Sequence, residues 1–183
     1  MSEIKSIRGL VKRFEAAPEE VQKYFAHLPK LLNEFPLEVS LSYVFSQVEL
    51  AQNMSLYCAI VKLHRADANL ARQAVDIHHM TREEFKEKFE IVFGRKMPKD
   101  IADILSKAED VRDKVMHGKK TTESEKRQAI GHVLDYAEKL NQKVHGLAGF
   151  KPFADLRGFK GAAKSLDKAT TRWILKGMEF NMG

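Results

Sequence analysis

The sequence has little of what a secreted or membrane-bound protein needs. Its 183 residues include a single cysteine, Cys58, so no internal disulfide can form. The most apolar stretch, from Leu56 to Leu63, is interrupted at Lys62 and is far shorter than the roughly 18 residues of a membrane span. The first eight residues lack the apolar block of a signal peptide. We therefore expect a cytoplasmic protein with no membrane partner, in which Cys58 is a small buried hydrophobic residue.

The sequence also lacks the alternation of polar and apolar residues that is typical of half-buried β-strands. Apolar residues recur instead at steps of three and four, which is the spacing of one helix face. The opening segment is an example, with Ile4, Ile7, Leu10, Val11 and Phe14. Hydrophobic residues make up 44% of the chain, which is ordinary for a protein with a packed core. We therefore predict an all-α fold.

Proline, glycine and capping residues predict where the helices begin and end. The segment from Leu37 to about Ile77 contains neither proline nor glycine, and predicts one bent helix or two helices with a break near Asp67 to Asn69. Two Thr-x-x-Glu capping boxes indicate further helix starts. The predicted starts are at Pro18, Thr81, Pro98 and Thr122, the predicted ends are at Gly94, Gly118, Gly146 and Gly149, and a last short helix is predicted near Leu166 to Lys176.

Positive charge is concentrated near the C-terminus. Seven bases and two acids lie between Lys151 and Lys176, and this excess of five accounts for most of the net charge of +6. A concentrated basic patch attracts phosphates, whereas the same residues can also be a solvated tail. We expect a helical bundle of residues 1–146 and a basic, partly helical C-terminal extension of residues 147–183.

One segment, residues 108–118, combines residues that can carry chemistry. On the predicted helix, Arg112 falls on the same face as the apolar residues Leu105 and Val115. A cation on an apolar face needs a carboxylate partner, a cleft or a subunit seam, because an unpaired buried charge is very costly. A buried Glu49 is a candidate partner. His117 follows at the end of the same helix, about 7–8 Å further along its axis.

An arginine and a histidine near one phosphate are what RNA cleavage without a metal requires. Histidine titrates near neutral pH, so it can take the proton from a 2′-hydroxyl or give one to the leaving oxygen. Arginine stays charged and can stabilise the negative phosphorane. One histidine does not easily fill both roles, whereas two copies related by a twofold axis can. The chemistry therefore favours a homodimer.

The sequence Arg-Asp-Lys-Val-Met-His-Gly, from Arg112 to Gly118, resembles the Arg-X4–6-His signature of the HEPN superfamily. In that superfamily a polar residue usually follows the arginine and glycine often follows the histidine. The resemblance extends over about residues 37–145. It implies a small helical bundle, commonly a homodimer, that cleaves RNA without a metal or cofactor, and many members act as toxins or in antiphage defence.

The resemblance implies a specific set of site residues. Arg112 would hold the scissile phosphate, His117 would act as acid or base, and Asp113 would support them. A cognate antitoxin or regulatory protein would be a further partner. The basic residues expected to bind RNA are Lys114, Lys119, Lys120, Arg157, Lys160, Lys164 and Arg172.

Two other interpretations of the sequence have to be considered. The first is a non-catalytic helical dimer that binds RNA or a regulatory protein, in which Arg112 would be held in an internal salt bridge. The second concerns the adjacent His78 and His79, which suggest a metal in principle. No nearby histidine, cysteine or carboxylate completes a recognised ligand set, so we expect no metal.

Overall fold

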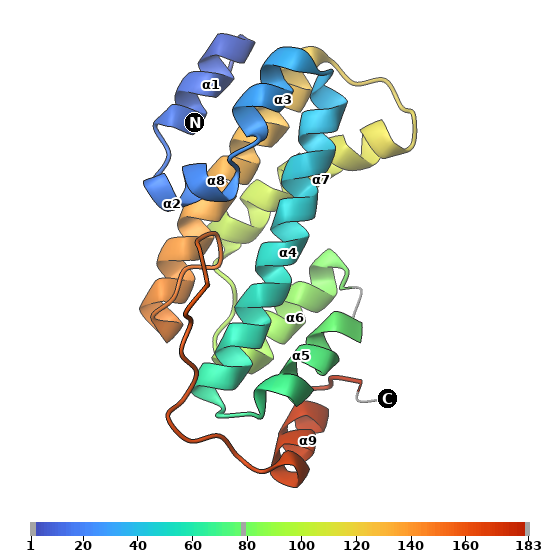
Figure 1. Ribbon diagram of the computed structural model, residues 1–183. Coiled ribbons are helices and arrows are strands. Elements are labelled where there is room, and N and C mark those ends of the chain that lie inside the picture. The colour runs from blue at the N-terminus through green and yellow to red at the C-terminus, as the bar shows by residue number, and fades with distance from the viewer. Residues whose placement is uncertain (1–2, 78–79, 182–183) are drawn as a thin grey trace. The chain divides into compact units, whose positions relative to one another are not determined.

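The computed structural model describes residues 3–77 and 80–181, and every regular element in these ranges is an α-helix (Figure 1). The predicted all-α class and helical bundle are therefore confirmed. Of the helices in these ranges, none is long and apolar enough to cross a lipid bilayer. The helices are α1 (Ile7–Glu15), α2 (Glu19–Tyr24), α3 (Leu28–Glu34), α4 (Leu37–Leu63), α5 (Ala68–Ile77), α6 (Arg82–Phe93), α7 (Lys99–Met116), α8 (Glu123–Ala148) and α9 (Lys168–Gly177).

Most helix boundaries follow the predicted capping residues. The long segment after Leu37 forms two helices, and Arg65 in the break between them has a left-handed φ of 58°. Both capping boxes form: the Thr81 hydroxyl accepts from the backbone N–H of Glu84, and that of Thr122 accepts from Glu125. One predicted helix end was wrong. Gly146 lies inside α8, because the helix continues until Gly149, which has a φ of 71°.

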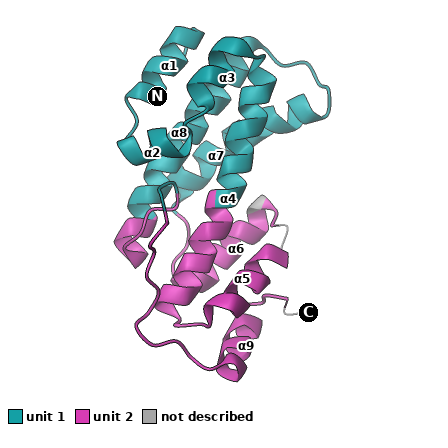
Figure 2. Cartoon of the chain, viewed as in Figure 1, with its two compact units in different colours: residues 1–50, 98–143, 153–155 teal, residues 51–97, 144–152, 156–183 magenta. Residues whose placement is uncertain are grey.

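The chain divides into two compact units, which Figure 2 shows in different colours. Unit 1 comprises residues 1–50, 98–143 and 153–155, and unit 2 comprises residues 51–97, 144–152 and 156–183. The long helices α4 and α8 each contribute residues to both units. This division does not coincide with the predicted boundary near residue 146, because residues 51–97 group with most of the C-terminal segment.

The core of unit 1 contains a cluster of aromatic rings. Phe153 lies at its centre, with ring centroids 5.2 Å from Tyr24, 5.7 Å from Phe25 and 6.0 Å from Tyr136. The buried Asn141 on α8 fixes this residue in place. Its side chain accepts a 2.7 Å hydrogen bond from the Phe153 N–H and donates one of 3.1 Å to the Phe153 carbonyl. The amide thereby satisfies two buried backbone groups that would otherwise be costly.

Unit 2 has a second core, into which the basic C-terminal segment is packed. Helices α5 and α9 contact each other, and the Thr171 hydroxyl on α9 accepts a 3.0 Å hydrogen bond from the Asp67 N–H. Lys88 on α6 is 7% exposed and donates to the carbonyl oxygens of Met178 and Glu179. The C-terminal segment is therefore a folded part of unit 2.

Candidate functional site

Arg112 lies on α7 at the point where the buried face of the helix becomes exposed. Ile101, Leu105 and Ala108 on that face are buried. Arg112 continues the same face, and its side chain is 36% exposed. Met116, one turn later, is 63% exposed. Other described residues therefore leave the end of this apolar face uncovered, and water reaches the guanidinium.

Two residues of α4 contact the Arg112 guanidinium. Its Nη2 donates a 3.2 Å hydrogen bond to the Glu49 carboxylate, and the group lies 5.4 Å from the centre of the Phe45 ring. The predicted contact with Glu49 is confirmed. The prediction that Glu49 is buried was wrong, since its side chain is 61% exposed. Glu49 lies at the edge of the helix packing, where its neighbour Leu50 is also exposed.

His117 is the C-cap of α7, and Gly118 follows it in a left-handed conformation with a φ of 63°. The Gly118 N–H donates to the Val115 carbonyl at 3.1 Å, and the Lys119 N–H donates to the Lys114 carbonyl at 2.8 Å. This pair of bonds is the Schellman motif, which needs a left-handed residue at the position of Gly118. The cap holds the backbone of His117 in place while its side chain is exposed.

The other predicted residues of this segment are also exposed. Asp113 lies 3.9 Å from Arg112, measured from its Oδ1 to Nη1. The Lys114 ammonium lies 3.9 Å from the Glu125 carboxylate, and Lys119 and Lys120 lie in the loop between α7 and α8. The structure therefore gathers Arg112 and these residues at one end of α7.

The remaining predicted RNA-binding residues belong to unit 2, whereas Arg112 and His117 belong to unit 1. All of them are exposed. Three lie in the irregular segment before α9, and one lies on α9 itself. These residues are Arg157, Lys160, Lys164 and Arg172.

Other candidates from the sequence have structural explanations or lie outside the described ranges. Cys58 is completely buried, and this burial raises the pKa of its thiol to about 12, so it is an unreactive core residue as predicted. The pair His78 and His79 lies outside the described residues. Within residues 3–77 and 80–181, no group of three potential ligands could hold a metal ion.

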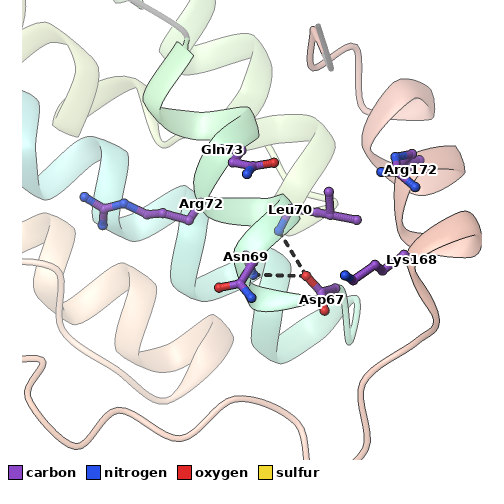
Figure 3. A pocket seen from close by; sticks show the side chains of 7 residues that line it. All are labelled: Asp67, Asn69, Leu70, Arg72, Gln73, Lys168 and Arg172. Atoms are coloured by element: carbon purple, nitrogen blue, oxygen red, sulfur yellow. Dashed lines mark hydrogen bonds between the residues drawn. The ribbon is translucent and has the colours of Figure 1, made fainter.

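Two of the clefts on the described surface lie away from Arg112 and His117. The cleft in unit 1, of about 370 Å³, is lined by Pro98, Asp100, Ile101, Lys139, Gln142 and Lys143. The cleft in unit 2, of about 480 Å³, lies between α5 and α9 (Figure 3).

Sequence reasoning missed two features near the candidate residues. The first is Phe45 beside the Arg112 guanidinium, although its place one turn before Glu49 on α4 could have indicated it. The second is the unit 2 cleft, to which α9 contributes Lys168 and Arg172. The spacing of four residues between these bases was a usable signal, but the contact with α5 was not visible in the sequence.

A comparison of the chain with protein-family models, with curated proteins and with solved structures found no match. The interpretation of the motif therefore depends on its residues and on the geometry described above.

Proposed function

We propose that this protein is a metal-independent endoribonuclease whose active site forms between two copies of the chain. The observation that carries the proposal is the end of α7, where Arg112, 36% exposed, is followed by an exposed His117 on a fixed helix cap. Of the five N–H donors of a guanidinium, the hydrogen bond to Glu49 occupies one. The others can bind a phosphate.

The proposed reaction is an attack by the ribose 2′-oxygen on the adjacent phosphorus. His117 of one subunit takes the 2′-hydroxyl proton as the new P–O bond forms. The bond from phosphorus to the 5′-oxygen breaks, and the protonated His117 of the other subunit gives a proton to that oxygen. Arg112 stabilises the extra negative charge on the phosphorane. Asp113 helps to orient the Arg112 side chain. The products are a 2′,3′-cyclic phosphate and a 5′-hydroxyl.

The uncovered apolar surface at the end of α7 supports a dimer. Met116 is 63% exposed, and Leu50 beside Glu49 is 46% exposed. Catalysis by an arginine and a histidine is strongest where water is excluded, because a low dielectric strengthens their interaction with the phosphate. A second copy packed over this surface would supply that exclusion together with the second histidine.

One observation favours the rival function, a helical dimer that binds RNA or a protein without cleavage. Arg112 is already paired with Glu49 in the same chain, as that reading requires. Both side chains of the pair are accessible to water, so the guanidinium is not buried inside the protomer. Cleavage measurements distinguish the two functions.

The test is digestion of a labelled RNA by the full chain in EDTA. We expect cleavage with cyclic phosphate ends, detected by mass spectrometry of the fragments. His117→Ala should lower the rate by about 10²–10⁴-fold, and Arg112→Ala by about 10²–10³-fold. His117 is exposed, and the ion pair of Arg112 with Glu49 is accessible to water, so the thermal stability of both variants should stay close to that of the wild type.

His132 provides a matched control, because Arg127 and His132 have the same spacing as the proposed pair. His132 is half-buried, and burial lowers its pKa, so it suits a structural role. His132→Ala should leave cleavage intact in the folded protein. Equal cleavage by wild type and His117→Ala would overturn the catalytic proposal, and binding without any cleavage would favour the rival.

A further inference from the structure

Helix α9 exposes the only tryptophan of the chain beside a line of positive charges. Trp173 is 84% exposed, which is exceptional for so large an apolar side chain. Lys168, Arg172 and Lys176 follow one another at steps of four residues and are all exposed. The helix contains no acid, and no ion pair joins these three cations to another described residue. The exposed face of α9 therefore combines an aromatic ring with an uncompensated positive charge.

The same helix forms one wall of the unit 2 cleft. Lys168 and Arg172 line this cleft together with residues of α5, and Figure 3 shows the Lys168 side chain extending toward Asp67. The lining of the cleft comprises three basic side chains, one carboxylate, two side-chain amides and one apolar side chain.

Two acids near this face, Asp67 and Asp167, cap helices, whereas a third, Glu179, lies 3.5 Å from the Lys88 ammonium. Asp67, which lines the cleft, accepts 3.1 Å hydrogen bonds from the N–H groups of Asn69 and Leu70. Asp167 accepts from the Thr170 hydroxyl and N–H, and these bonds lower the pKa of Asp167. The third basic residue of the cleft, Arg72, is paired with Asp76 at 2.8 Å, and Figure 3 shows its guanidinium pointing away from α9. Both aspartates cap helices, and among the described residues neither forms an ion pair with an α9 cation.

We propose that the exposed surface of α9, together with the adjoining cleft, binds single-stranded nucleic acid. Trp173 stacks on a base, and Lys168, Arg172 and Lys176 bind the neighbouring phosphates. Stacking requires the face of a base to be accessible, so a single strand or an unpaired loop fits this surface better than a duplex. The inference goes beyond the proposed ribonuclease activity, because it concerns binding alone and stands even if His117 performs no chemistry.

Charge complementarity decides between nucleic acid and other occupants. An apolar protein partner would leave three desolvated cations without counter-charges, which is costly. A purely anionic surface would satisfy the cations but give Trp173 no ring to stack on. Nucleic acid alternates phosphates and aromatic bases along one strand, and so matches both features of α9.

Because Trp173 is the only tryptophan, its intrinsic fluorescence reports on this surface directly. The experiment is titration of the full-length chain with a thymidine oligomer, which lacks the 2′-hydroxyl and so cannot be cleaved by the proposed reaction. We expect quenching of the Trp173 emission on binding. The same oligomer paired into a duplex should quench much less, and heparin, a polyanion without bases, should bind without comparable quenching.

Variants separate stacking from charge, with binding measured by the anisotropy of a labelled oligomer. Trp173→Ala should weaken binding by about tenfold, whereas Trp173→Phe should retain most of the affinity, because a phenyl ring still stacks. Reversing both Lys168 and Arg172 to Glu should weaken binding further and reduce its dependence on salt. The matched control reverses two exposed cations of the same unit, Arg95 and Lys96, and should change binding far less.

Three results would overturn the proposal. Equal affinity of wild type and Trp173→Ala would reduce the surface to a general polyanion site. Equal binding of duplex and single strand would remove the preference for unpaired bases. A shift of Trp173 emission with phosphatidylserine vesicles but not with oligonucleotides would assign the surface to membranes. None of these results depends on RNA cleavage, so the binding and catalytic proposals can fail separately.

Discussion

At the scale of single residues, Arg112 has an environment that suits ligand binding better than stability. Its partner Glu49 is 61% exposed, and Arg112 itself is 36% exposed. Ion pairs that are this accessible to water contribute about 0–1 kcal/mol to the free energy of unfolding. The chain therefore keeps a cation on an apolar helix face without gaining much stability from it.

If Glu49 competes with phosphate for Arg112, removing its charge should improve RNA binding. We expect Glu49→Gln to lower the KM for RNA by about two- to fivefold, and to change the free energy of unfolding by less than about 1 kcal/mol. Steady-state cleavage and urea unfolding measure the two quantities. Glu90→Gln, an exposed position on α6, makes the same change of charge and should leave KM unaltered. A higher KM for Glu49→Gln would show that the carboxylate positions Arg112 instead.

Lys126 has the opposite environment, because it is 5% exposed and lies between two carboxylates. It donates to Glu38 of α4 and, at 2.7 Å, to Glu123 of α8. The hydrogen bond from Lys126 lowers the pKa of Glu38. A carboxylate with a lowered pKa contributes stability that is present above its unfolded pKa and is lost as the pH falls through its folded pKa.

Lys126→Met should therefore destabilise the protein in a pH-dependent way. The difference from wild type in the free energy of unfolding should be largest near neutral pH and should shrink as Glu38 becomes protonated, below about pH 4. Urea unfolding of both proteins from neutral pH to below about pH 4 measures this difference in the free energy of unfolding. Lys30→Met is the control, because Lys30 is 69% exposed and lies as far as 3.9 Å from its partner Glu34. This variant should show little dependence of its stability difference on pH. A constant difference at all pH values would contradict the role given to Glu38.

At the scale of elements, the sequence predicted what depends on neighbouring residues. Both capping boxes and the end of α7 at Gly118 are local, since the groups that bond are within five residues of one another. The exposure of Met116 on the apolar face of α7 was not predictable. Its exposure depends on which distant helix packs on that face. Helix periodicity predicts which residues form the apolar face, but it does not predict which other helix packs on them.

Gly118 offers a test of the helix cap that places His117. A Cβ at this position would meet no atom within 4 Å, so Gly118→Ala adds only the strain of a left-handed backbone, about 1 kcal/mol. We expect this loss in thermal unfolding and a clearly larger proportional loss of RNA cleavage, because the cap positions His117. Gly118→Asn should be milder, since asparagine tolerates this conformation. Cleavage that falls no further than stability would show that the cap does not position the imidazole.

At the scale of the whole molecule, two features could not be predicted from the sequence. The division into two compact units depends on contacts between residues 51–97 and the C-terminal segment, which are far apart in the chain. The exposure of Met116 and Leu50 likewise follows from the complete packing of unit 1. The proposed dimer is a hypothesis built on this exposed surface.

Met116→Lys tests whether the end of α7 is a subunit interface. We expect the wild type to be a dimer by light scattering, and the variant to be monomeric and inactive while it remains folded. Ile77→Lys places the same charge at an exposed apolar position of unit 2 and should leave the dimer intact. A monomeric wild type that still cleaves RNA would contradict the shared site.

The central claim is that two imidazoles act together on one phosphodiester, and a mixed dimer tests it most directly. Two affinity tags allow purification of a dimer with one wild-type chain and one His117→Ala chain. If one histidine is the base and the other the acid, cleavage should fall at least about a hundredfold below that of the wild type. Retention of half the wild-type activity would mean that each chain works alone, and would contradict the account.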